Sequence, residues 1–166
     1  MKLTGTARKL LLTLHISTSV SWLGVAAGFF ALTVAGQQDP ALNVYPALNT
    51  LSRTVLFPLS VLTLTTGILQ ALLTPWGLWK HYWVVFKLFF TLIAALVMWN
   101  EMTTIAMLSG MATTGTQAQG LHQQGLAGLS VHSGVGALLL LGINLLSVLK
   151  PRGETGWGRR RKPNPQ

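Results

Sequence analysis

Cysteine is absent from the 166-residue sequence. Its absence excludes disulfide bonds, thiolate metal sites, cysteine nucleophiles and haem attached through thiols. It carries no information about the redox compartment. Any metal or cofactor site in this chain must therefore be built from other side chains.

Charged residues are also scarce, at 9% of the chain, and only three of them are acidic. Soluble domains contain about 25% charged residues. Hydrophobic residues make up 50% of this chain, and the mean hydropathy is +0.50. Because so little polar surface is available, most of the chain must face lipid rather than water.

Motifs that carry the chemistry of soluble enzymes are missing. The chain contains no Gly-x-Gly-x-x-Gly, P-loop, His-Glu-x-x-His or Gly-x-Ser-x-Gly pattern. The sequence therefore assigns no enzymatic reaction.

Four long apolar segments are present instead, and roughly 20 apolar residues suffice to cross a bilayer as a helix. The segments cover approximately residues 10–35, 50–74, 82–107 and 125–149. They predict an all-α fold, a four-transmembrane-helix bundle within residues 10–150. The first apolar run is longer than the 7–15 residues of a signal-peptide core, so we expect it to be retained.

The basic residues are distributed unevenly between the connectors, which predicts the topology. Lysine and arginine favour the cytoplasmic side of a membrane protein. The first and third connectors contain none, so we expect both termini in the cytoplasm of a multi-pass protein of the bacterial inner membrane. The residues on the cytoplasmic side are Lys2, Arg8, Lys9, Lys80, Lys150, Arg152, Arg159, Arg160, Arg161 and Lys162.

The two ends of the chain carry much of the net charge of +9. Residues 1–9 form a basic N-terminus, and residues 151–166 form a basic tail that is predicted to be disordered. Beside a membrane, the run from Arg159 to Lys162 favours anionic lipid over nucleic acid as a partner.

Polar residues inside the spans fall into two layers. His15, Lys87 and Asn144 each lie about 5–6 residues from the cytoplasmic end of a span, which places them roughly 8–9 Å deep. Lys87 either extends to the headgroups or binds an anionic group. His15 either hydrogen-bonds Ser, Thr or Asn144 across the bundle, or ligates a metal.

The outer layer contains Arg53, Glu101 and His132 on three different spans. Arg53 and Glu101 are the only opposite charges near that level, and a buried charge needs a partner. We therefore expect an Arg53–Glu101 ion pair, which His132 joins through a hydrogen bond. The alternative is that this layer forms a ligand or proton site.

Depth also bears on haem ligation. His15 and His132 are offset by about 11–12 residues, or roughly 17 Å along the membrane normal. Both imidazoles would have to lie within about 2 Å of one iron, so we do not expect one haem between them. His15 with His81, or His15 with Lys87 as a propionate partner, is easier geometrically.

Several local patterns predict structure within the second span and the third connector. Pro58 should kink the second span, while Thr63, Thr65, Thr66 and Gly67 offer hydroxyl groups and a point of close approach. Residues 107–124 are rich in Thr, Gly and Gln and predict an exposed loop.

Two stretches resemble known proteins. They are Leu14-His15-Ile-Ser-Thr-Ser-Val-Ser-Trp22-Leu-Gly24, and Thr74-Pro-Trp76-Gly-Leu-Trp79-Lys80-His81-Tyr-Trp83-Val-Val-Phe-Lys87. The chain resembles a family of uncharacterised bacterial four-span integral membrane proteins. More remotely, it is similar to copper-resistance-D-like proteins and J-type protoporphyrinogen oxidases.

In the J-type oxidases, the histidine that matches His15 is implicated in haem binding, and the third span opens with a pattern that matches Trp83 and Lys87. The resemblance therefore implies a haem b site. The present chain departs from that pattern in a longer third connector, and no second haem ligand aligns. The copper-related proteins imply metal transport, but the sequence lacks the Met and His clusters that copper prefers.

These observations leave three functions open. The first is a haem-binding or redox-related membrane protein with His15 as the haem or metal ligand and with Lys87 and His81 as further candidate site residues. The second is a cofactor-free accessory or scaffolding subunit, which acts with membrane protein partners or as a homo-oligomer. The third, weaker, is a transporter of copper or another metal ion.

Overall fold

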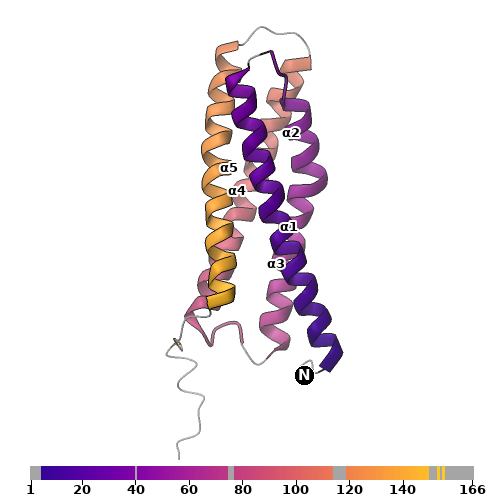
Figure 1. Ribbon diagram of the computed structural model, residues 1–166, viewed down its shortest axis with the longest axis vertical. Helices are drawn as coiled ribbons and strands as arrows, with labels where there is room; N and C mark the ends of the chain where they lie inside the picture. Colours follow the sequence, from indigo (N-terminus) through magenta and orange to yellow (C-terminus); the bar gives the residue numbers. More distant parts are fainter. Residues whose placement is uncertain are drawn as a thin grey trace, which may run out of the picture.

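Four long helices form the protein in a computed structural model, which describes residues 5–39, 41–74, 77–113, 119–149, 153 and 155 (Figure 1). The first, third and fourth are α1 (Gly5–Gln38), α4 (Tyr82–Thr113) and α5 (Gln119–Leu149). The second is a composite of α2 (Tyr45–Leu51), η1 (Ser52–Leu56) and α3 (Phe57–Leu73). All four are long and apolar enough to cross a membrane, which confirms the predicted all-α four-helix bundle.

The helices pack as a ring in the order α1, α3, α4, α5 and back to α1. In the described residues, the backbones of α1 and α4, which lie diagonally opposite, do not approach each other. Figure 1 places the N-terminus, the α3–α4 connector and the end of α5 at one end of the bundle. The end of α1, the helix α2, the end of α4 and the start of α5 lie at the other end, so both termini of the helical bundle share one end.

The buried core lies mainly toward the end that carries α2. Leu48 and Ile105 are fully buried, and the rings of Trp22 and Phe29 pack into the same cluster. In contrast, many leucine and valine side chains on the outer faces are exposed, such as Leu138 at 70%. A soluble monomer rarely exposes apolar surface on this scale. Such a surface is favourably solvated by the hydrocarbon chains of lipids.

Pro58 alters the second span without breaking it. Proline has no N–H to donate and its ring clashes with the carbonyl four residues earlier. The backbone widens to π-helical geometry over η1, just before Pro58, and the N–H of Phe57 donates to the carbonyl of Ser52, five residues back. The predicted distortion is therefore a π-helical segment that continues directly into α3.

The outer ends of the helices extend further than predicted. α4 continues to Thr113 and α5 begins at Gln119, so residues 107–113 and 119–124 are helical and the predicted loop over 107–124 is wrong for these positions. The first connector is also shorter, because α1 reaches Gln38 and α2 starts at Tyr45. The predicted tail over residues 151–166 lies almost entirely outside the described residues.

Long-range hydrogen bonds hold these outer ends together. The Tyr45 hydroxyl donates to the carbonyl of His122 at 2.7 Å. Gln37 Nε2 donates to the carbonyl of Leu126 at 2.9 Å and to Ser130 Oγ at 2.7 Å. These contacts join α1 and α2 to the first turns of α5, which explains why the helix persists there.

Candidate functional site

A cavity of about 490 Å³ lies between the four helices near the end that carries the N-terminus. We call it the inner cavity. Small-molecule sites in proteins have volumes of roughly 300–1,000 Å³. His15, Lys87 and Asn144 all line this cavity, in agreement with the depth that their positions predict. The other lining residues are Arg8, Leu12, Ile16, Ser19, Val20, Thr63, Leu64, Gly67, Gln70, Ala71, Thr74, Leu78, Trp83, Val84, Leu88, Thr91, Leu141, Leu145, Ser147 and Val148.

The imidazole of His15 is held by a hydrogen bond across the bundle, between Nδ1 and Thr66 Oγ1 at 3.0 Å. The Thr66 hydroxyl donates its single proton to the carbonyl of Leu62 at 2.7 Å. It must therefore accept from His15, so Nδ1 carries the ring proton. The lone pair of the neutral ring then resides on Nε2.

Gly67 allows the His15 ring to approach α3. A Cβ atom at Gly67 would lie 3.1 Å from His15 Cε1 and 3.8 Å from Nε2. The first distance is tighter than ordinary contact, so a side chain here would push the imidazole away from α3. Thr66 and Gly67 are among the residues that the sequence marked for hydroxyl groups and close approach, and together they fix the position of this ring.

Lys87 enters the same cavity from α4 and donates a short hydrogen bond to the hydroxyl of Ser147 on α5. Asn144, one turn before Ser147, donates from Nδ2 to the carbonyl of Leu140 at 2.9 Å. These contacts turn the ammonium group inward, toward the bundle, rather than outward to the headgroups. Ser147 lies three residues after Asn144, a spacing that places both on one helix face.

The inner cavity is positively charged. Arg8 and Lys87 line it, and no aspartate or glutamate occurs among its described lining residues. Thr63 also faces this cavity; its side chain is only 4% exposed, and its Oγ1 has no hydrogen-bond partner among the described residues. Buried polar atoms are normally hydrogen-bonded, so this hydroxyl is available to a ligand.

His81 does not join the site. It lies in the α3–α4 connector and stacks near Trp83, with ring centroids 6.3 Å apart. Trp83 lines the inner cavity, whereas His81 is not among the residues of its wall. The two histidines therefore differ: the structure brings His15 together with Lys87, and it leaves His81 outside.

The outer layer pairs differently from the prediction. Glu101 forms an ion pair with His132, with 2.8 Å between Oε1 and Nδ1. Arg53 is exposed and donates from Nε to Asn49 Oδ1 at 3.0 Å, one turn earlier on its own composite helix. Within the described chain the expected Arg53–Glu101 pair is absent, because Glu101 faces α5 instead.

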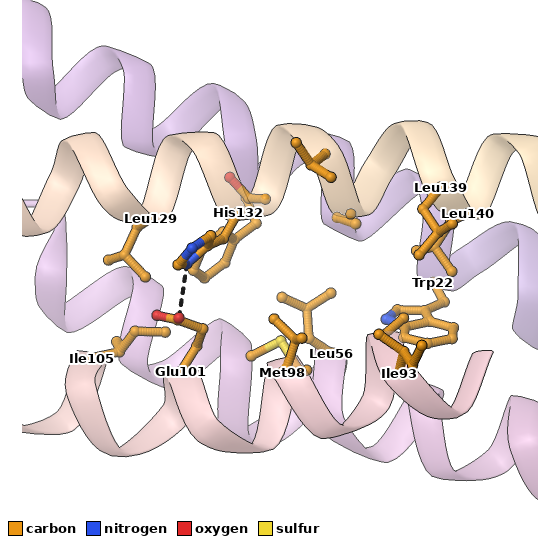
Figure 2. Close-up of a pocket in the computed structure, with 17 residues that line it drawn as sticks. Trp22, Leu56, Ile93, Met98, Glu101, Ile105, Leu129, His132, Leu139 and Leu140 are labelled. Carbon is orange, nitrogen blue, oxygen red and sulfur yellow. Dashed lines mark ion pairs between the residues drawn. The ribbon is translucent and has the colours of Figure 1, made fainter. Parts of the chain in front are cut away.

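A second cavity, of about 270 Å³, contains the Glu101–His132 pair. We call it the outer cavity. Figure 2 shows the pair near one end, with side chains of α4 and α5 facing each other across the space and the Trp22 indole near the other end. The polar groups of the wall are the side chains of Glu101, His132 and Ser133 and the indole N–H of Trp22. The other lining side chains are apolar.

His15 and His132 thus line different cavities, as their difference in depth predicts. Among the described residues, no group of three or more His, Cys, Asp or Glu side chains is placed to hold a metal ion. A metal held by several protein side chains, as a transporter site would need, therefore has no support from this geometry.

Comparison of the chain with protein-family models, with curated proteins and with solved structures finds no match.

Proposed function

We propose that this multi-pass membrane protein binds haem b in the inner cavity, with His15 as the axial ligand, and that its role is redox-related. The observation that supports the proposal most directly is the state of His15. Its Nδ1 proton is committed to Thr66, and its Nε2 lone pair is left in a cavity with two cationic side chains.

The hydrogen bond to Thr66 is the kind that metal-bound histidines make. A ligating imidazole almost always uses its second nitrogen to donate to a neighbouring acceptor, which fixes both the tautomer and the ring orientation. Here that acceptor is supplied by α3, and Gly67 sets the distance between ring and helix. The ligand is therefore oriented by the protein before any metal binds.

The rest of the cavity matches an anionic, amphipathic molecule. Haem b has a flat apolar macrocycle and two carboxylates. Arg8 and Lys87 line the cavity and would pair with the carboxylates, and charge-assisted bonds of this type are stronger than neutral ones. The leucine, isoleucine and valine side chains of the wall suit the macrocycle.

His15 is the one imidazole among the described lining residues. If haem is bound there, His15 would hold it without help from another histidine of the described wall. Single-histidine ligation is the pattern of haem proteins that bind or activate a small ligand, as in globins and peroxidases.

Absorbance spectroscopy tests the proposal. The chain is purified in detergent from cells with ample haem supply, and reduced-minus-oxidised spectra are recorded for the unaltered protein, His15→Ala and His81→Ala. We expect a b-type spectrum in the unaltered protein and in His81→Ala, and its loss in His15→Ala. A colourless unaltered protein would overturn the proposal.

A second candidate function has its own support. The polar groups of the inner layer are partly satisfied within the bundle, His15 by Thr66 and Lys87 by Ser147. A cofactor-free accessory or scaffolding subunit needs no more than this. In that case the protein is colourless, and His15→Ala lowers the melting temperature without affecting capture of a membrane partner.

We also infer that the end carrying the N-terminus faces the cytoplasm of a bacterial inner membrane. Arg8, Lys9 and Lys80 gather at this end, which supports the positive-inside assignment. A reporter fused at Gly120 should behave as periplasmic. Anionic lipids are the proposed partners of the basic tail, and vesicles with and without phosphatidylglycerol would test that.

A further inference from the structure

The outer cavity differs from the inner one in charge, and we infer that it is a second ligand site. We propose that it binds the head group of a neutral lipophilic molecule that carries hydroxyl or carbonyl oxygens, of the quinol or quinone class. The proposal concerns binding in the outer cavity and does not depend on haem in the inner one.

Access to this cavity is from the side. Several of its lining residues on α4 and α5 are also exposed on the outer surface, namely Ile93 at 36%, Val97 at 44% and Val135 at 61%. His132 is 54% exposed. Since these positions lie in the middle and outer parts of the spans, the opening between α4 and α5 faces lipid. A ligand would enter from the bilayer.

The size and the lining indicate how such a molecule would bind. At about 270 Å³, the cavity is smaller than the roughly 300–1,000 Å³ of sites that enclose a whole drug-sized ligand. Only a head group fits, and a chain would extend into lipid through the opening. The rings of Trp22 and Phe29 in the wall are suited to pack against a flat ring.

Hydrogen bonding selects for oxygen atoms on that ring. His132 uses Nδ1 for Glu101, and Nε2 has no hydrogen-bond partner among the described residues. Nε2 accepts from a hydroxyl when the imidazole is neutral, and it donates to a carbonyl when the ring is charged. The carboxylate of Glu101, 15% exposed, holds the ring in place through Nδ1 and leaves Nε2 for the ligand.

Charge selects against anionic lipids. With a neutral imidazole the Glu101–His132 pair carries one negative charge, and with an imidazolium it carries none. Neither state attracts a fatty-acid carboxylate or a phosphate, and no arginine or lysine lines the outer cavity among the described residues. The head group is therefore not anionic.

Two glycines of α5 provide matched variants. Gly136 lines the outer cavity and Gly128 does not, yet at both positions an added Cβ meets no atom within 4 Å. Gly136→Phe should fill the cavity with little disturbance of helix packing. Gly128→Phe adds the same side chain to the same helix outside the cavity.

The test is equilibrium binding of radiolabelled decylubiquinone to the full chain in phosphatidylcholine nanodiscs, after subtraction of partition into empty discs. We expect saturable binding near one molecule per chain, about tenfold or greater weakening by Gly136→Phe, and no change with Gly128→Phe. His132→Leu should weaken binding about threefold to tenfold, the effect of one hydrogen bond.

Three results would overturn the proposal: no saturable binding to the unaltered chain, equal binding by Gly136→Phe and Gly128→Phe, or displacement of the quinone by an equal concentration of palmitate. The elution volume in size-exclusion chromatography and the melting temperature of each variant identify misfolding. If Gly136→Phe misfolds, Leu129→Trp serves as the second variant that fills the cavity. The haem spectrum of the same samples is a separate readout, so failure of one proposal is distinguishable from failure of the other.

Discussion

The inner and outer cavities lie in one bundle and are lined by the same helices, yet they differ in almost every chemical property. The inner cavity has two cationic side chains, several hydroxyls and an imidazole fixed by Thr66. The outer one has a single ion pair in an apolar wall that opens toward lipid.

The difference follows from topology. Basic residues gather at one end of a membrane protein because they orient it, and here that end also borders the inner cavity. Arg8 belongs to the N-terminal group that predicts orientation, and it lines the cavity as well. If both proposals hold, the same charge serves insertion and ligand selection, and the outer cavity, which no lysine or arginine lines among the described residues, is left for neutral molecules.

Charge reversal in the inner cavity should change haem affinity more than the other substitutions considered below. Lys87→Glu replaces an inward-facing cation with an anion, so haem carboxylates would be repelled. We expect haem affinity to fall about 100-fold, with each tenfold corresponding to 1.4 kcal/mol. Haemin titration followed by absorbance measures it.

Lys80→Glu is the matched control for Lys87→Glu, because Lys80 lies near the same end but outside the cavity wall. It should leave the affinity nearly unchanged. Equal losses in the two variants would mean that the charge acts at long range and that the inner cavity is not the site.

Removal of the acceptor for His15 should have the next largest effect. Thr66→Val keeps the side-chain shape and leaves the Nδ1 proton without its partner. Loss of an outer-shell partner typically costs 10–100-fold in metal affinity, and we expect haem affinity to fall within that range. Thr65→Val is the control, because this adjacent threonine has no hydrogen bond to His15 among the described residues; a similar loss there would contradict the assigned tautomer.

A methyl group at Gly67 should have a smaller effect, because it displaces the imidazole without removing a bond. The added Cβ would lie 3.1 Å from His15 Cε1, so the ring must move by a few tenths of an ångström. We expect a shifted Soret band and an affinity about threefold lower for Gly67→Ala. Gly24→Ala, where a Cβ meets nothing within 4 Å, should show neither change.

The smallest effect on haem is expected from the outer cavity. Glu101→Gln removes the charge partner of His132 but leaves the inner cavity untouched. Sites without shared contacts are usually additive, so haem affinity should change by less than about twofold. A loss comparable to that of Thr66→Val would show that the two cavities act as one site.

The fold could be predicted from composition, whereas the helix ends could not. Hydropathy reports where a helix lies in hydrocarbon, and it falls where the chain reaches the interface. The helix itself can continue past that point, as α4 does to Thr113 and α5 does from Gln119. The Tyr45–His122 contact that supports this extension is tertiary and has no local signal.

The depth of each residue in its span predicts the level of the candidate site. It does not predict which neighbouring helix each side chain faces. Rise per residue places His15, Lys87 and Asn144 at one level, and the structure lines one cavity with them. Depth also predicts an ion pair between Arg53 and Glu101, and this prediction is wrong because residues at one level can face different neighbours. The rotation of a helix about its own axis depends on how it packs against its neighbours. In this bundle, Glu101 contacts His132 and Arg53 contacts Asn49.

Haem content per chain tests the central claim most directly. The pyridine haemochrome of purified protein is compared between the unaltered chain, His15→Ala and His132→Ala, with each normalised to protein concentration. The account predicts about one haem per chain in the unaltered protein and in His132→Ala, and almost none in His15→Ala. Haem retained by His15→Ala, or lost equally in both variants, would contradict it.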